Sequence, residues 1–242
     1  MNQYPDAWES ALSDLKFLCA GFMKTGLTSL HDTAASLGLR TRHRRRAIWS
    51  AFLRGDYETV MAHYETGDFF VDWPHPYMYA PFLKRYGERA RIILTLRDSD
   101  SWYASLLRHN QHAHPITHSQ KFIFGRYYPS GFKDEHIAIY ERHNAEVVDY
   151  FERVGARDQL LVLNLEDPDK VSKLEAFCGS ASRGQTPEYQ HSNASAARKH
   201  RDFVDVLRKR YNAVIQPLYA RWAPRLKPEP GPYRGALDAD AV

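Results

Sequence analysis

The sequence predicts an α/β protein: three αβα layers around a central, mostly parallel sheet of about five strands. Short apolar runs alternate along the chain with longer segments of helical periodicity. Strands that alternate with helices form parallel sheets covered on both faces. The length of 242 residues suits one large domain. We expect that domain at residues 1–222 and a disordered tail at 223–242, where four prolines and a fading apolar content argue against a core.

The expected strands are short apolar runs, most of them bounded by turn-forming residues. KFLCA ends at Gly21, DFFVD is stopped by Trp73–Pro74, and ARIILTL is the strongest run. A shorter strand follows Gly38, and QLLVLNL is the last clear one. In chain order the five are placed at residues 16–20, 39–43, 68–72, 90–96 and 159–165.

Helices are expected where apolar residues recur at helical spacing. In the first helix Leu27, Leu30, Ala34 and Leu37 share one face, and the helix after residue 97 has a cap available in Asp98, Ser99 or Asp100. Residues 110–133 show no clear pattern. The expected helices span residues 26–37, 46–63, 77–86, about 99–109, 134–154, 167–178 and 194–222.

Composition excludes several classes of protein. The 33 Lys and Arg residues against 29 Asp and Glu give a net charge of +4, too little for a nucleic-acid coat but compatible with an anionic small ligand. With two cysteines there is no disulfide scaffold. No apolar run reaches the roughly 20 residues of a membrane span, and the first residues do not resemble a signal peptide. We therefore expect a cytoplasmic protein. Clustered histidines at 109–118 lack Cys or acidic companions, so no metal site is predicted.

The segment GFMKTGLTS at 21–29 links the first strand to the first helix. Backbone N–H groups at a helix N-terminus favour an anion, and Lys24 adds a positive charge. The segment departs from the GxxxxGK[ST] phosphate loop because its lysine precedes the second glycine. We predict anion binding here; the alternative is an ordinary strand–turn–helix with a solvated lysine. The predicted contacts are Met23, Lys24, Thr25, Gly26, Leu27, Thr28 and Ser29.

A second anion site is suggested by Arg97, which directly follows the strand at 90–96, and by Ser105 eight residues further on. A guanidinium suits bidentate phosphate binding. The alternative is that Arg97 forms an ion pair with Asp98 or Asp100. Together with the loop, Arg97 and Ser105 indicate a ligand that carries two separate anionic groups.

These blocks, in this order, resemble the P-loop-type sulfotransferases. The resemblance is carried by GFMKTGLTSL, by DFFVDWPHPYMYAPFLKRYGERARIILTLRDSDSWYASLLR, by ERHNAEVVDYF with QLLVLNLED, and by PEYQHSN. It covers about residues 17–193 and implies a fold like that of P-loop NTPases. The family transfers a sulfuryl group from 3′-phosphoadenosine 5′-phosphosulfate (PAPS) to a hydroxyl or amine, with the 3′,5′-bisphosphate (PAP) as product. No metal is required.

By this resemblance Arg97 with Ser105 matches the 3′-phosphate site, and the residues that match the 5′-phosphosulfate loop are Lys24, Thr25, Gly26, Thr28 and Ser29. Lys24 would stabilise the bridging oxygen of the leaving group. Two residues depart from the pattern. Leu27 stands where the family usually has Thr, and Phe70 where cytosolic members have a Lys. The basic residues between Arg40 and Arg46 are candidates for supplying that missing charge.

The acceptor hydroxyl needs a proton acceptor. Asp72 ends the third strand where related enzymes place His or Glu, and it is the favoured residue. His75 is the rival, because imidazole suits proton transfer near neutral pH. A third interpretation makes Asp72 a cap of the turn at Trp73–Pro74. The acceptor is left open between small molecules and glycans, and the sequence leaves a homodimer open.

Two other functions remain compatible with the sequence. A kinase or NTPase would use Asp72 to hold magnesium at the end of its strand. A catalytically silent protein would keep the nucleotide site without turnover, as Leu27 and Phe70 allow.

Overall fold

The computed structural model describes residues 15–43, 46–112, 118–179 and 203–222. Contacts divide these residues into two compact units. The first holds the described residues up to Leu96 and from Glu146 to 179, and the second those from Arg97 to Ala145 and from 203 onward. The prediction of a single domain at 1–222 stays a prediction, and the predicted tail at 223–242 lies outside the described residues.

The first unit contains a sheet of five strands, and all of its strand pairs are parallel. The sequence prediction of a mostly parallel sheet of about five strands is confirmed. The strands are β1 (Lys16–Cys19), β2 (Thr41–Arg42), β3 (Phe69–Phe70), β4 (Ala90–Leu96) and β5 (Leu160–Asn164), in the order β2-β3-β1-β4-β5. The register pairs Leu18 with both Phe70 and Ile92. From β1 the chain proceeds to one side of the sheet and later to the other, which makes the carboxyl end of β1 a topological switch point.

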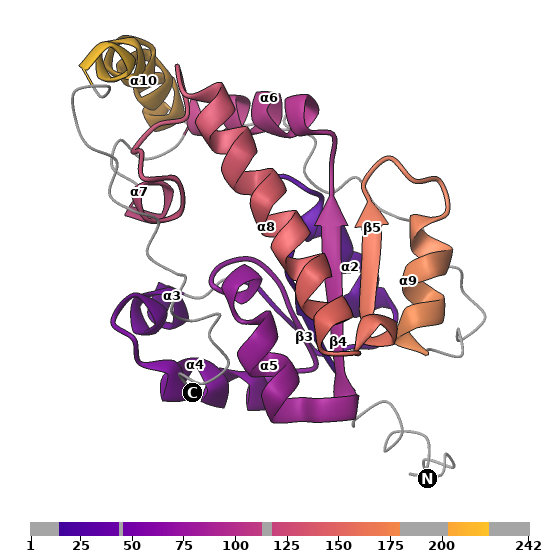
Figure 1. The fold of residues 1–242 in the computed structure, drawn as a ribbon. Coiled ribbons are helices and arrows are strands. Elements are labelled where there is room, and N and C mark those ends of the chain that lie inside the picture. The colour runs from indigo at the N-terminus through magenta and orange to yellow at the C-terminus, as the bar shows by residue number, and fades with distance from the viewer. Residues whose placement is uncertain (1–14, 44–45, 113–117, 180–202, 223–242) are drawn as a thin grey trace, which may run out of the picture. The chain divides into compact units, whose positions relative to one another are not determined.

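Helices cover both faces of this sheet (Figure 1). The helices in the described part of the chain are α2 (Leu27–Ser36), α3 (Arg46–Leu53), α4 (Tyr57–His63), α5 (Tyr79–Tyr86), α6 (Ser99–Asn110), α7 (His118–Phe124), α8 (Lys133–Arg153), α9 (Lys170–Cys178) and α10 (Phe203–Trp222). Four 3₁₀ turns accompany them: η1 (Tyr64–Thr66), η2 (His75–Tyr77), η3 (Gly87–Arg89) and η4 (Arg157–Gln159). None of these helices combines the length and hydrophobicity needed to cross a membrane.

The core follows from the alternation of side chains along each strand. Phe17 of β1 and Ile93 of β4 point to one face, where they pack with Leu30 of α2 and Leu174 of α9. The intervening residues point to the other face, where Phe70 packs edge-on against Phe82 of α5. These strand residues are fully buried, which explains why their sequence is continuously apolar.

Two helix predictions need correction. The helix predicted at 46–63 is two helices, because Gly55 adopts a positive φ of 73° and the Asp56 side chain accepts from Thr59 N at 3.1 Å to start α4. The stretch 110–133, predicted without regular structure, contains α7. Of the helix predicted at 194–222, the structure describes 203–222 as α10.

Candidate active site

The turn after β1 lies tightly against β4. A Cβ atom on Gly21 would stand 1.9 Å from Thr95 Oγ1 and 2.9 Å from the Thr95 backbone nitrogen. Ala20 N donates to Ile93 O at 2.9 Å just before this approach. Glycine is therefore required at position 21, because any side chain would push the turn away from the sheet.

Thr25 holds the same turn from within. Its hydroxyl donates to Phe22 O at 2.6 Å and lies 2.5 Å from Thr95 Oγ1, and the side chain is buried. Thr95 Oγ1 is also 3.8 Å from Cys19 Sγ. The Thr25 hydroxyl is thus used inside the protein, which leaves its backbone as the part that can meet a ligand.

The segment then turns into α2 through two residues with left-handed backbone. Lys24 has φ 73° and Gly26 has φ 93°. The helix begins at Leu27 with no side-chain cap and no acidic residue in its first turn. Lys24 is half-buried beside it. A helix start of this kind, with a lysine next to it, has the character of an anion site.

Leu27 itself points away from this surface. Its side chain is buried in the apolar cluster formed by α2, α9 and the sheet. The position that departs from the sulfotransferase pattern therefore supports the core with its side chain, and only its backbone remains for an anion.

Asp72 lies at the same edge of the sheet. It comes two residues after Phe70, as Ala20 comes two residues after the paired Leu18, so it stands beside the start of the turn. Burial raises the pKa of the Cys19 thiol to about 11, and the negative charge of Asp72 contributes to that increase. The two side chains are therefore close enough to interact electrostatically. The backbone of Asp72 is left-handed, with φ 72°.

The Asp72 carboxylate faces His43. Oδ2 of Asp72 lies 3.9 Å from Nδ1 of His43, with the aspartate side chain 16% exposed and the histidine 46%. The turn that follows has no side-chain cap; the hydrogen bond there joins His75 N to the Asp72 carbonyl at 3.0 Å. The capping interpretation of the Asp72 side chain is therefore not needed, since the carboxylate is directed to an imidazole.

His43 and its neighbour His31 were missed in the sequence. The two rings meet edge to face with centroids 5.7 Å apart, and His31 Nδ1 lies 3.0 Å from Asp32 Oδ1. His43 directly follows β2, and β2 is parallel to β3. The signal that could have found it is that parallel strands bring their carboxyl ends, and so His43 and Asp72, to one edge.

His75 lies elsewhere, within the aromatic core. It is 1% exposed, its Nδ1 forms a 3.0 Å hydrogen bond with Tyr64 Oη, and its ring stacks on that of His63. Burial lowers the pKa of His75 to about 3, with a smaller contribution from His63 and His43. A neutral imidazole shielded from solvent is poorly suited to collect a proton from an incoming acceptor.

Two of the basic residues after residue 39, Arg40 and Arg42, make contacts within the protein. The Arg40 side chain donates two hydrogen bonds to the Asp68 carboxylate, from Nε to Oδ2 at 2.8 Å and from Nη2 to Oδ1 at 2.7 Å. Arg42 donates to the Thr66 carbonyl and to the Thr41 carbonyl. These two arginines hold β2 and the segment before β3. Of the other candidates for the charge missing at Phe70, Arg44 and Arg45 lie outside the described residues.

The predicted second anion site falls in the second unit. Arg97 N donates to Tyr140 Oη at 2.9 Å, and that hydroxyl donates to Arg97 O at 3.1 Å. Asp98 caps α6 by accepting from Ser101 N, and Asp100 pairs with Lys133 at 2.8 Å. The hydrogen bonds from Ser101, and to a smaller extent the charge of Arg97, lower the pKa of Asp98, so the interaction of Asp98 with Arg97 is retained beside the cap. Ser105 is buried on α6.

A kinase would need side chains that hold magnesium. Within the described part of the chain, no group of three or more His, Cys, Asp or Glu side chains is arranged to hold a metal ion. Of the clustered histidines, His114 lies outside the described residues.

The fold and the turn after β1 define an α/β protein whose switch point carries a strand–turn–helix with an uncapped helix start and Lys24 beside it. A family model for the sulfotransferase domain matches residues 16–197. The chain therefore belongs to the sulfotransferase family, as the resemblance in the sequence implied, and sulfotransfer is its general activity. No curated protein matches the chain significantly.

Proposed function

We propose that the protein transfers a sulfuryl group from PAPS to the hydroxyl or amine of a small molecule or glycan. The observation that carries the proposal is the start of α2, which has neither a capping side chain nor an acidic residue and has Lys24 beside it. The sulfotransferase domain identifies sulfuryl transfer as the chemistry. The two free, buried cysteines agree with a cytoplasmic location, which we propose as well.

The donor nucleotide would be held by its charged groups. The backbone from Met23 to Ser29 would bind the 5′-phosphosulfate, with Thr25 and Leu27 contributing through N–H groups because their side chains are directed inward. Arg97 and Ser105 would bind the 3′-phosphate. No step of this scheme requires a divalent metal, since sulfuryl transfer relies on in-line placement and charge stabilisation.

In the reaction the acceptor oxygen or nitrogen forms a bond to sulfur while the bond from sulfur to the bridging oxygen breaks. Lys24 would stabilise the negative charge that appears on that bridging oxygen. The acceptor proton would pass to His43, with Asp72 stabilising the resulting imidazolium. Catalytic hydrogen bonds are often long in unliganded proteins, so a separation of 3.9 Å is compatible with this pairing. Asp72 as the direct proton acceptor is the alternative, and His75 is assigned a structural role.

Nucleotide binding is tested first by thermal shift with PAP and, separately, with ATP plus magnesium. Ligand at 100 times its dissociation constant should stabilise the protein by about 2.7 kcal/mol. We expect stabilisation by PAP alone. A shift with ATP and magnesium alone would support the kinase alternative, and no shift with PAP would refute PAPS as donor. A PAP shift without turnover of labelled PAPS on any acceptor would support a silent nucleotide-binding protein.

Variants then assign the roles. Lys24→Ala should lower turnover by roughly 100-fold, while Lys84→Ala, on exposed surface of α5, should leave it unchanged. His43→Gln should lower turnover roughly 100-fold, and the neighbouring His31→Gln should have a smaller effect. If His43→Gln is fully active and Asp72→Asn is not, Asp72 is the proton acceptor.

A further inference from the structure

Within the second unit, α10 packs against the end of α6 through polar side chains. Asn212 and Gln216 are buried and donate to the Asn110 carbonyl at 3.3 and 3.1 Å, and Asn212 also donates to Gln111 O at 3.1 Å. One turn further, Tyr219 Oη accepts from Tyr127 N at 3.1 Å. The Tyr219 ring also packs against Tyr128 and Phe132. A surface helix normally buries an apolar stripe, whereas the two buried side chains of α10 are amides.

The opposite side of α10 is an exposed apolar stripe. Phe203 is 75% exposed, Trp222 67% and Val214 61%. At 100° per residue, the six residues of the stripe fall within an arc of roughly 100°, and they extend about 28 Å along the helix. The stripe consists of Phe203, Leu207, Tyr211, Val214, Leu218 and Trp222, and the 50% exposed Val204 lies at its edge. An apolar stripe of this length on a surface indicates an interaction site.

The spacing of the stripe is the same when read from either end. Successive members are 4, 4, 3, 4 and 4 residues apart. A second α10 laid antiparallel would therefore pair Leu207 with Leu218, Tyr211 with Val214 and Phe203 with Trp222, each in both directions. Self-complementary pairing of this kind is what a two-fold interface requires. The central steps of 4, 3 and 4 are also those of a coiled-coil seam.

Charges agree with the antiparallel arrangement. In a parallel pair Arg210 would face Arg210 and Arg221 would face Arg221. In the antiparallel pair Arg221 lies level with Val204, beside the aromatic ring of Phe203, and Arg210 lies level with Ile215. Like charges are separated, and a guanidinium next to an aromatic face is favourable.

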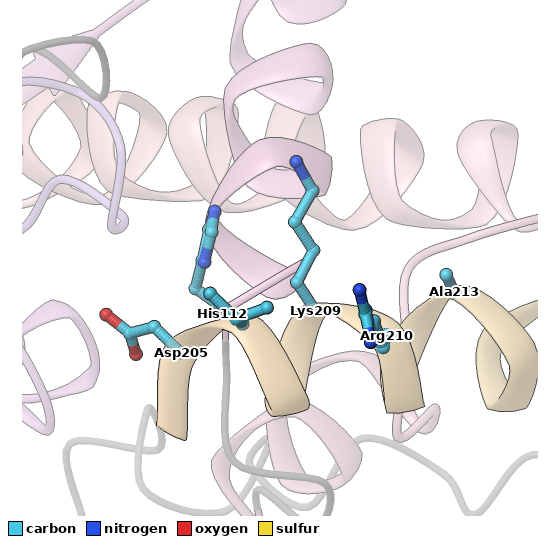
Figure 2. A pocket seen from close by; sticks show the side chains of 6 residues that line it. His112, Asp205, Lys209, Arg210 and Ala213 are labelled. Carbon is cyan, nitrogen blue, oxygen red and sulfur yellow. The ribbon is translucent and has the colours of Figure 1, made fainter. Parts of the chain in front are cut away.

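The flank of the stripe is not filled by the unit itself. A hollow of about 270 Å³ runs along α10, and Figure 2 shows Lys209 extending from the helix on the same side as His112. The residues that line the hollow are His112, Asp205, Val206, Lys209, Arg210 and Ala213. The stripe therefore lies between the polar, packed side of α10 and an open flank.

We propose that the α10 stripe is the interface of a homodimer in which two copies of α10 pack antiparallel about a two-fold axis. This inference stands apart from the proposed enzymatic function, because it concerns residues with no assigned role in sulfuryl transfer.

The first test is the molar mass of the full chain by sedimentation, from about 1 to 200 µM. We expect dimers at the upper end, and monomers for Leu207→Asp and Val214→Asp throughout. Val154→Asp is the matched control, since Val154 and Leu207 are 46% and 47% exposed; it should still dimerise. Circular dichroism checks that each variant remains helical. A monomeric wild type, or dimers in both stripe variants, would overturn the proposal.

Disulfide trapping tests the orientation. A Leu207→Cys chain mixed with a Leu218→Cys chain should give a crosslinked heterodimer, and either variant alone should crosslink at least tenfold more slowly. Positions 207 and 218 are about 16 Å apart along the helix axis. In the antiparallel pair the two copies of either position are therefore separated by about that distance, which is too far for a disulfide bridge. Cys19 and Cys178 are fully buried and should not interfere. Fast crosslinking of the single variants would indicate a parallel pair and contradict the assignment. Monomers that bind vesicles of anionic lipid through the stripe would also contradict it.

Discussion

The hydroxyl oxygens of Thr25 and Thr95 lie 2.5 Å apart, and this contact joins the turn after β1 to β4. Since Thr25 also donates to the Phe22 carbonyl, one buried side chain closes the turn on itself and ties it to the sheet. The geometry of the candidate anion site thus depends on a hydroxyl that does not face the site.

Replacing Thr25 by Val should destabilise the protein by about 2 kcal/mol, because it leaves the Phe22 carbonyl and the Thr95 hydroxyl buried without this partner. Thr41→Val, at a half-buried position in β2, is the control and should change stability by less than about 0.5 kcal/mol. Urea unfolding measures both. Equal stability of the two variants would show that the threonine contact contributes little.

Restoring the family residue with Leu27→Thr should lower stability by about 1–2 kcal/mol, since Leu27 belongs to the core cluster. The affinity for PAP should change by less than about twofold, because the side chain at this position is directed inward. Calorimetric titration measures the affinity. A tenfold gain in affinity would mean that the new hydroxyl reaches the nucleotide after all.

Asp68→Asn should destabilise the protein by about 2 kcal/mol at pH 7, because it weakens the two-point contact with Arg40. Burial alone would raise the pKa of Asp68, but the hydrogen bonds and charge of Arg40 outweigh it and hold the pKa below its usual value. The contribution is therefore present above the unfolded pKa near 4 and lost as pH falls through the folded value. Unfolding curves at pH 7 and pH 3 should show the difference between variant and wild type shrinking; a difference independent of pH would contradict this.

His75 should make the wild type sensitive to acid. Its folded pKa of about 3 lies below the ordinary value near 6.5, so between these values the unfolded chain binds a proton that the folded protein excludes. Stability should fall by up to about 1.4 kcal/mol per pH unit as pH drops through this window. His75→Asn should be less stable at pH 7, where a small cavity remains, and should show a flatter decline. The check is guanidinium unfolding between pH 7 and pH 4, and parallel declines would exclude His75 as the cause.

Much of the fold could be predicted from the sequence. Strands such as ARIILTL are buried on both faces of a parallel sheet and must be continuously apolar, so they can be recognised without a structure. The turn at 21–29 could also be recognised from the sequence. It begins with Gly21, and the close contact with Thr95 leaves no room for a side chain at that position. The break at Gly55 was missed because a single glycine within an apolar periodic segment is also compatible with one helix.

The sequence by itself determined the α/β class, the strand–turn–helix that carries Lys24, and the family. Only the tertiary structure decided which side chains meet and which way they face. His43 and Asp72 are far apart in the chain and come together because β2 and β3 run parallel. Periodicity marks α10 as a helix, yet it does not say that the polar side is the buried one, because that depends on the Asn110 carbonyl it packs against. Such contacts arise between distant segments, and a local pattern carries no information about them.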